Sequence, residues 1–102
     1  QIKEYLHQNY AVPSLSVPDI SEHVRLSPTY VCTLFKNETG QTLNQYLTDY
    51  RIKMSKQFLS DPLYKITDIS AKVGYSDGNY YSKAFRKIVG LSPSEYREKM
   101  LR

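Results

Sequence analysis

The sequence predicts an all-α fold of seven helices, arranged as two helix-turn-helix subdomains joined by a long central helix. Helix-capping residues recur along the whole chain, apolar residues recur at helical spacing, and the second half of the chain repeats the pattern of the first. Strand signals are weak, because no Asn-Gly or Asp-Gly pair lies between two alternating runs. We therefore expect one domain over residues 1–102, without a sheet.

Residues 1–41 are predicted to form the first unit, with three helices. A first amphipathic helix ends before Pro13, because the residue that precedes a proline is disfavoured in a helix. Ser16 is expected to cap a short second helix, and Ser27 a third helix that ends at Gly40. The apolar residues expected to face the core are Ile2, Tyr5, Leu6, Ile20, Val24, Val31, Leu34 and Phe35.

The longest helix, which links the two units, is predicted over residues 42–59. Thr42 and Gln45 have the spacing of a capping box, and the Asp61-Pro62 pair ends the helical segment. Its apolar stripe is expected to contain Leu43, Tyr46, Leu47, Tyr50, Met54, Phe58 and Leu59.

Residues 60–102 are predicted to form the second unit, again with three helices. Thr67 is expected to cap a short helix, and Ser76 a longer one that ends at Gly90. Ser92 begins a second capping box, which opens the last helix. The apolar residues expected on the inner faces are Ile69, Val73, Tyr81, Ala84, Phe85, Ile88, Tyr96 and Met100, and Tyr80 is expected in the core or at its edge.

The two units resemble each other in sequence. With an offset of 49 residues, residues 19–21 (Asp-Ile-Ser) match residues 68–70, and after one inserted residue the offset becomes 50. A short helix, a tight turn and a longer capped helix are what a helix-turn-helix motif requires. In the second turn Gly74 can adopt a positive φ, whereas Arg25, at the equivalent position, must either accept strain or bend differently.

Charge and composition exclude several classes of function. Residues 1–50 hold three Lys or Arg against five Asp or Glu, and residues 51–102 hold eleven against five, so the basic second half favours a polyanionic partner. One cysteine and two histidines offer neither a disulfide nor a zinc-ligand spacing, and we predict no metal and no cofactor. No paired acid–base group or phosphate loop suggests an enzyme. No apolar run reaches membrane-spanning length and no signal peptide opens the chain, so we expect no membrane partner and a cytoplasmic location.

Residues 51–97 resemble the signature region of the AraC/XylS family of transcription regulators. Tyr81 stands where phenylalanine is usual in that family, and Ser55 where alanine is usual. The first half is similar to the variety found at the C-terminus of YesN-type response regulators. The segments that carry the resemblance are 26–30, 34–40, 51–52, 58–59, 66–70, 73–76, 85–87 and 90–97.

The resemblance implies sequence-specific binding of double-stranded DNA and a role in transcription regulation. Two recognition helices, about 28–39 and 77–89, would enter successive major grooves. The linking helix of about 18 residues would be about 27 Å long, against about 34 Å between successive major grooves on one face of B-DNA. A rigid rod of that size can hold both recognition helices against one face of a duplex.

Outward polar residues of the recognition helices are the candidate contacts. Asn79 can pair with an adenine edge and Lys83 with guanine, whereas small hydroxyls and a thiol make single contacts. We expect the second unit to supply most of the electrostatic affinity. The candidate base contacts are Thr29, Cys32, Thr33, Gly78, Asn79, Ser82 and Lys83. Those of the first unit are proposed because the family uses these positions to contact bases. The candidate phosphate contacts are Ser27, Lys36, Thr42, Ser76, Arg86, Lys87 and Ser92.

Further partners follow from the same interpretation. Because the chain begins within a helical segment, we expect it to be the output domain of a longer, two-component regulator with an N-terminal receiver or effector domain. RNA polymerase is an expected partner, and the isolated domain is expected to be a monomer. The alternative is a helical protein-interaction module without DNA binding, which would need an exposed apolar groove for a partner helix.

Overall fold

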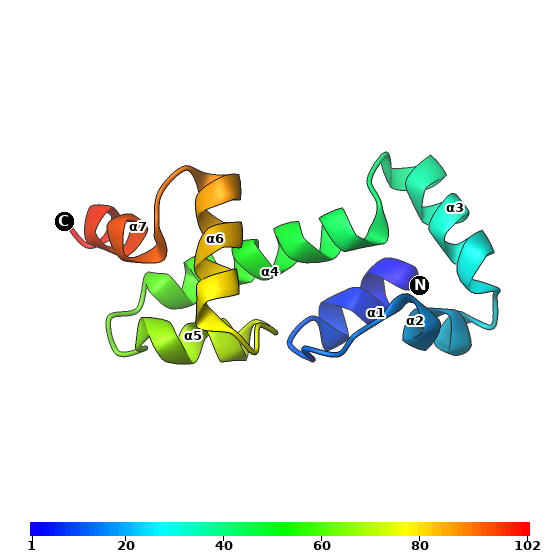
Figure 1. The fold of residues 1–102 in the computed structure, drawn as a ribbon, viewed down its shortest axis with the longest axis horizontal. Helices are drawn as coiled ribbons and strands as arrows, with labels where there is room; N and C mark the ends of the chain where they lie inside the picture. The colour runs from blue at the N-terminus through cyan, green and yellow to red at the C-terminus, as the bar shows by residue number, and fades with distance from the viewer.

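The structure, a computed structural model, describes all 102 residues as an elongated body of 46 × 22 × 21 Å that contains helices and no strand. Figure 1 shows α4 along the long axis, with three helices at each end. The all-α fold with seven helices is confirmed. The helices are α1 (Ile2–Asn9), α2 (Val17–Val24), α3 (Pro28–Thr39), α4 (Leu43–Leu59), α5 (Ile66–Lys72), α6 (Gly78–Val89) and α7 (Pro93–Met100).

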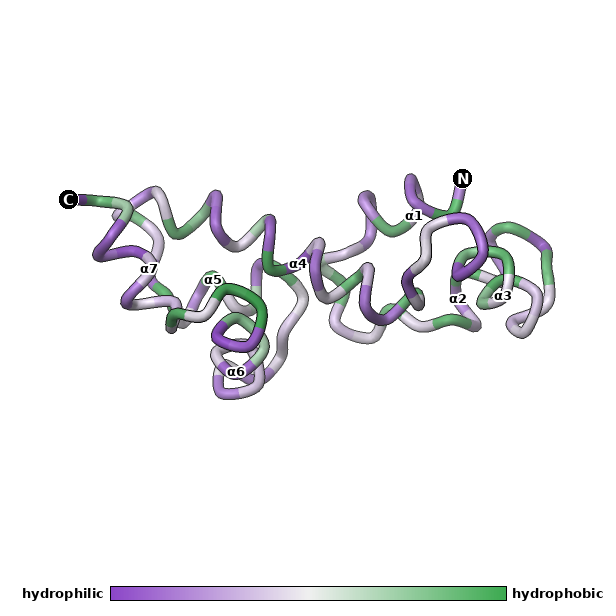
Figure 2. Tube along the Cα trace, turned by 90° about the horizontal axis from the view of Figure 1, so that it is seen from above, coloured by the Kyte–Doolittle hydropathy of each residue, from purple (hydrophilic) through white to green (hydrophobic).

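Each end of the molecule has its own hydrophobic core, and α4 contributes to both. Figure 2 shows hydrophobic residues interspersed with hydrophilic ones along most of the chain, as expected of helices that bury one face. The core between α1, α2, α3 and α4 contains Leu6, Ile20, Val31, Phe35, Leu43 and Leu47. The second core, formed by α4, α5, α6 and the turn between α5 and α6, contains Ile52, Leu59, Ile69, Val73, Tyr75, Tyr81 and Phe85.

Most of the predicted helix ends are confirmed. The side chains of Ser16, Ser27, Thr42 and Ser92 each accept a hydrogen bond from the backbone N–H three residues further on. The capping box at Ser92 also lowers the pKa of Glu95 below its usual value, because the Ser92 backbone and hydroxyl donate hydrogen bonds to the carboxylate. α3 and α6 end at Gly40 and Gly90, which adopt the left-handed backbone conformation. Glycine adopts it without strain because it has no Cβ atom.

Two predicted caps are wrong. α5 begins at Ile66, and Thr67 lies inside its first turn, because the carbonyl of Lys65 already accepts the first backbone hydrogen bonds. α6 is capped by Asp77, whose carboxylate accepts the N–H of Asn79 at 2.9 Å, in place of Ser76. A negative side chain at the positive end of a helix has the advantage over a neutral hydroxyl.

Several residues predicted to face the core do not. Ile88 is 43% exposed, Met100 48% and Tyr80 68%, and Leu34 is half-buried. Ile88 lies in the last turn of α6, beside a polar cleft, so no apolar neighbour covers it fully. Conversely, Ile52 and Ser55 of α4, which were absent from the predicted stripe, are buried.

The two helix-turn-helix turns have the same hydrogen bond. The N–H of Leu26 donates to the carbonyl of Ser21 at 3.1 Å, and the N–H of Tyr75 donates to Ser70 at 2.9 Å. Both turns pass through a positive φ, 59° at Arg25 and 98° at Gly74. Arg25 therefore accepts the strain that the sequence comparison anticipated, at a cost of about 1 kcal/mol.

Two arginines connect segments that are distant in the sequence, through equivalent hydrogen bonds to backbone carbonyls. Arg51 donates from Nε to the carbonyl of Tyr10 at 2.8 Å and from its guanidinium to the carbonyl of Val12 at 2.9 Å. Arg97 donates to the carbonyls of Leu59 and Asp61, which are the equivalent positions 49 residues later. Each arginine thus pairs one carbonyl at the end of a helix, that of Tyr10 or Leu59, and adds a second donor to a loop carbonyl, that of Val12 or Asp61.

Candidate nucleic-acid interface

α3 and α6 bury equivalent residues and expose equivalent faces. Val31 and Phe35 of α3 correspond to Tyr81 and Phe85 of α6 at an offset of 50, and all four are buried. The opposite side of each helix is exposed, because a helix that packs along one stripe leaves the other side to solvent. The molecule therefore presents two similar polar faces, one at each end of α4.

The predicted base contacts are divided between these two faces. Thr29, Cys32 and Thr33 are exposed on α3. On α6, Asn79 and Lys83 are exposed at the positions equivalent to Thr29 and Thr33. Gly78 is exposed at the start of α6, and Ser82 is half-buried beside it. The structure thus brings three of the predicted residues together on α3 and four on α6.

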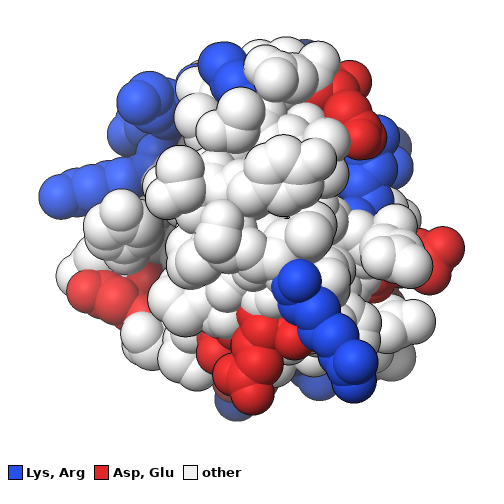
Figure 3. Space-filling model, turned by 90° about the vertical axis from the view of Figure 1, so that its right-hand side faces the viewer, with Lys and Arg blue, Asp and Glu red and all other residues white.

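The predicted phosphate contacts fall into basic side chains and helix N-termini. Lys36, Arg86 and Lys87 are exposed, and the only ion pair of the structure joins Arg102 to Glu98 elsewhere. None of the three therefore forms an ion pair with a protein carboxylate. Figure 3 shows the end of the molecule formed by α2 and α3, where both basic and acidic side chains surround a mostly uncharged centre. Lys and Arg outnumber Asp and Glu only in the second half of the chain, by eleven to five over residues 51–102.

The helix N-termini differ in what they offer an anion. Ser27, Thr42 and Ser92 cap α3, α4 and α7 as neutral hydroxyls, and at α7 the Glu95 carboxylate also accepts the Ser92 N–H. At α6 the cap is the carboxylate of Asp77, with Ser76 exposed one residue before it. A carboxylate already placed at the positive end of the helix repels phosphate, so this N-terminus is a poorer anion site than the sequence predicted.

Two exposed tyrosines lie on the recognition helices, although neither is among the predicted contacts. Tyr30 and Tyr80 are equivalent at the offset of 50, and they are 53% and 68% exposed in the first turns of α3 and α6. The internal repeat is the feature of the sequence that could have identified these two tyrosines as equivalent. Their recurrence adds one large aromatic side chain to the outward surface of each recognition helix.

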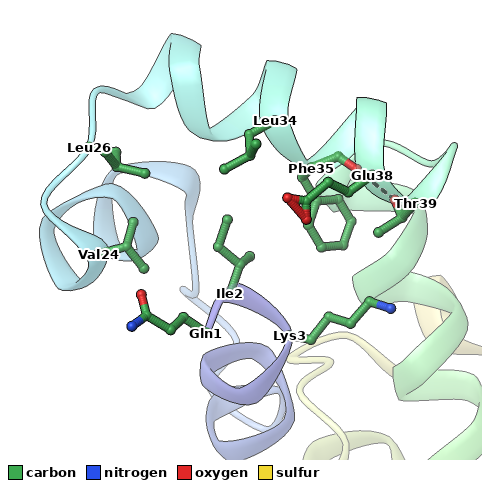
Figure 4. Close-up of a pocket in the computed structure, with 9 residues that line it drawn as sticks. All are labelled: Gln1, Ile2, Lys3, Val24, Leu26, Leu34, Phe35, Glu38 and Thr39. Carbon is green, nitrogen blue, oxygen red and sulfur yellow. Dashed lines mark hydrogen bonds between the residues drawn. The ribbon is translucent and has the colours of Figure 1, made fainter.

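The first unit also has an apolar hollow of about 380 Å³, shown in Figure 4. Ile2, Val24, Leu26 and Leu34 point into it from three helices and the turn between α2 and α3. It explains why Leu34 is only half-buried. No group of three or more His, Cys, Asp or Glu side chains could hold a metal ion, and no helix is long and apolar enough to cross a membrane.

Comparison with known proteins agrees with this arrangement. The family model described as "Helix-turn-helix domain" matches residues 20–99. The chain is 36% identical over 100 residues to the Msm operon regulatory protein of Streptococcus mutans, covering 98% of this chain and 36% of that protein. It is 38% identical over 96 residues to the transcriptional regulatory protein HptR of Staphylococcus aureus, covering 94% and 37%. The chain thus spans about a third of the length of these relatives.

The fold is shared with solved structures. The C-terminal domain of the two-component response regulator yesN from Fusobacterium nucleatum superposes with a TM-score of 0.90 at 28% identity, over 94% of this chain and 93% of that one. The family match covers both helix-turn-helix units, and the resemblance noted in the sequence carries the same motifs. The chain therefore belongs to the AraC/XylS family of helix-turn-helix DNA-binding domains.

Proposed function

We propose that the chain binds double-stranded DNA sequence-specifically, with α3 and α6 in successive major grooves of one face. The observation that carries this proposal is the pair of repeat-equivalent polar faces, fixed to one helix of 17 residues. At about 1.5 Å per residue α4 is about 25 Å long, which suits grooves about 34 Å apart with the recognition helices set outward at its ends. One chain can then do what usually takes a symmetric dimer.

The second unit is assigned the more specific base contacts. Asn79 can accept from and donate to one adenine edge, and Lys83 can donate to guanine N7 and O6. Thr29, Cys32 and Thr33 of the first unit can touch a thymine methyl group or make one hydrogen bond each. Gly78 allows close approach of the α6 backbone, and Ser82 adds a hydroxyl beside it.

The basic residues are assigned to phosphates. Arg86 and Lys87, with Lys36 in the first unit, position the protein on the duplex without selecting a base. The neutral N-termini at Ser27 and Thr42 can add backbone N–H contacts, with Ser76 and Ser92 weaker contributors beside the carboxylates of Asp77 and Glu95. Most of the electrostatic affinity then comes from the second unit.

We further propose that the chain is the output domain of a longer regulator. Residues 1–41 and 60–102 are taken as its two DNA-reading units, and residues 42–59 as the linker. The relatives' names, an operon regulatory protein and a two-component response regulator, support a regulatory role. A preceding receiver or effector domain, contact with RNA polymerase, a cytoplasmic location, a monomeric isolated domain and the lack of enzymatic activity belong to this proposal.

Selection of bound duplexes from a random pool, followed by gel shifts at several salt concentrations, tests the proposal. We expect two unlike half-sites about one helical turn apart and an affinity that falls steeply with salt. A pool that yields no enriched motif, with no shift even in dilute buffer, would contradict DNA binding and favour a protein-interaction module instead.

A further inference from the structure

A polar cleft of about 560 Å³ lies over α4, between the two recognition helices. One wall holds Lys36 at the end of α3, and the other holds Lys87 of α6. We call this the inter-unit cleft, and its polar residues are Lys36, Gln41, Asn44, Gln45, Thr48, Asp49 and Lys87. It is built from both units, so neither half of the chain forms it alone.

The floor of the inter-unit cleft lies on the side of α4 that carries α6. Asn44, Thr48 and Ser55 share one face of α4, because they are separated by four and seven residues. Near its end this face is covered by α6, since Ser55 is fully buried beside Tyr81 of α6. Nearer its start the same face is open. The floor of the inter-unit cleft therefore lies on the same side of the molecule as α6.

The walls and floor of the cleft suit an anion. Lys36 and Lys87 form no ion pair, and Asp49 is the single carboxylate of the lining. Asp49 accepts a hydrogen bond from the amide of Gln41 at 2.9 Å. The side chain of Asn44 makes no hydrogen bond within the protein, and Gln45 uses only its carbonyl oxygen, as the acceptor of the Thr42 N–H. Amide donors on the floor thus remain available between two ammonium groups.

We infer that the inter-unit cleft binds the sugar–phosphate backbone of the DNA segment between the two half-sites. This inference rests on the proposed function. A duplex whose adjacent major grooves hold α3 and α6 turns its intervening minor groove, with a row of phosphates on each side, toward α4. Lys36, Lys87 and the floor amide of Asn44 then contact those phosphates. Since such contacts fix register and carry no base identity, α4 acts as a third contact region that sets the half-site spacing.

Two substitutions on α4 with opposite expected effects test this. Asn44→Glu places a carboxylate on the floor, in the first turn of α4, where a negative charge favours the helix. We expect the affinity for the selected duplex to fall about fivefold and the salt dependence to flatten. Asp49→Asn removes the one carboxylate of the cleft, and we expect the affinity to rise about threefold. Kd is measured by fluorescence anisotropy on a labelled duplex.

Gln57→Glu is the matched control. It makes the same change of charge on α4, at an exposed position that helical spacing places on the opposite side from Asn44. We expect its Kd to change less than about twofold. Replacing the phosphates between the half-sites by neutral methylphosphonates should remove the difference between Asn44→Glu and Gln57→Glu.

The outcomes separate this inference from the proposed function. If the unmodified chain binds no duplex, both fall. If it binds, and Lys83→Ala changes base preference while Asn44→Glu and Asp49→Asn behave like Gln57→Glu, the proposed function stands and the cleft is not a contact. A methylphosphonate duplex that leaves the penalty of Asn44→Glu unchanged would likewise overturn the inference.

Discussion

The side chain of Arg51 lies against the backbone of Gly74, so that a Cβ atom at Gly74 would stand 2.7 Å from Arg51 Nε. The same Nε donates a hydrogen bond to the carbonyl of Tyr10 at 2.8 Å. The turn of the second unit, the middle of α4 and the segment after α1 therefore meet at one point. This contact holds the two units to each other in addition to α4 itself.

Gly74→Ala should destabilise the fold more than an ordinary glycine substitution. The new methyl group would collide with Arg51 and with the Tyr10 carbonyl, in a backbone conformation that side chains disfavour. We expect a loss of about 2–4 kcal/mol in the free energy of unfolding. Gly40→Ala is the control, since its φ is also positive but nothing lies within 4 Å, and about 1 kcal/mol is expected. Equal losses in urea denaturation would show that the contact with Arg51 is unimportant.

Ser27→Ala should weaken the start of the first recognition helix. The Ser27 hydroxyl accepts the N–H of Tyr30 at 3.1 Å, so its removal is expected to cost about 1 kcal/mol. Thr67→Ala should cost nearly nothing, because Thr67 lies inside the first turn of α5 and does not cap it. Thermal unfolding of both variants checks the difference, and a larger loss for Thr67→Ala would disagree with the observed start of α5.

Stability should fall at high pH because of buried tyrosines. Burial raises the pKa of Tyr75 and of Tyr81 above the ordinary value of about 10. The unfolded chain ionises these groups first, so their contribution is complete below about pH 10 and is lost as the pH rises through the folded pKa. The free energy of unfolding, measured by urea denaturation in alkaline buffers, should decline accordingly.

Tyr81→Phe should reduce that decline at little cost near neutral pH. The Tyr81 hydroxyl is buried without a well-formed hydrogen bond, and the nearby Ser55 hydroxyl donates its hydrogen to the Ile52 carbonyl at 2.8 Å. Removing an unsatisfied hydroxyl is expected to change the free energy of unfolding by less than about 1 kcal/mol. A Phe variant that is much less stable at neutral pH would mean that the hydroxyl has a partner.

Lys83→Ala and Arg86→Ala should impair DNA binding differently. Loss of Lys83 is expected to relax preference at one base pair and to cost roughly 1–3 kcal/mol on the selected sequence. Loss of Arg86 should weaken every sequence alike and reduce the salt slope by about one unit. Titrations on matched and mutated half-sites at several salt concentrations distinguish them; equal losses on every duplex would refute the division of roles.

Local patterns in the sequence were sufficient for the helices and insufficient for the contacts between units. Ser27 is followed by Pro28, which favours it as a cap, whereas Ser76 and Asp77 are adjacent and the sequence does not say which one caps. Leu34 and Ile88 have the spacing of core-facing residues on their helices. Leu34 nevertheless lies beside the apolar hollow and Ile88 beside the inter-unit cleft, because the neighbouring helices do not extend far enough to cover them. The contact of Arg51 with Tyr10 spans 41 residues, and the inter-unit cleft needs both units to be placed.

The internal repeat also hid one compensating change. At the offsets of the repeat, Leu6 and Val31 of the first core correspond to Ser55 and Tyr81 of the second. In the second unit, the large side chain of Tyr81 on α6 thus faces the small side chain of Ser55 on α4. In the first unit, the equivalent residues Val31 and Leu6 are closer to each other in size. Such an exchange keeps the core filled, and only the structure shows that the two positions face each other.

The proposed function requires two recognition helices held rigidly against one face of a duplex. Hydroxyl-radical footprinting of the chain on its selected duplex tests this most directly. We predict two protected patches on the same face, about ten base pairs apart, with both lost together as salt rises. A single protected patch, unchanged when either half-site is mutated, would contradict it.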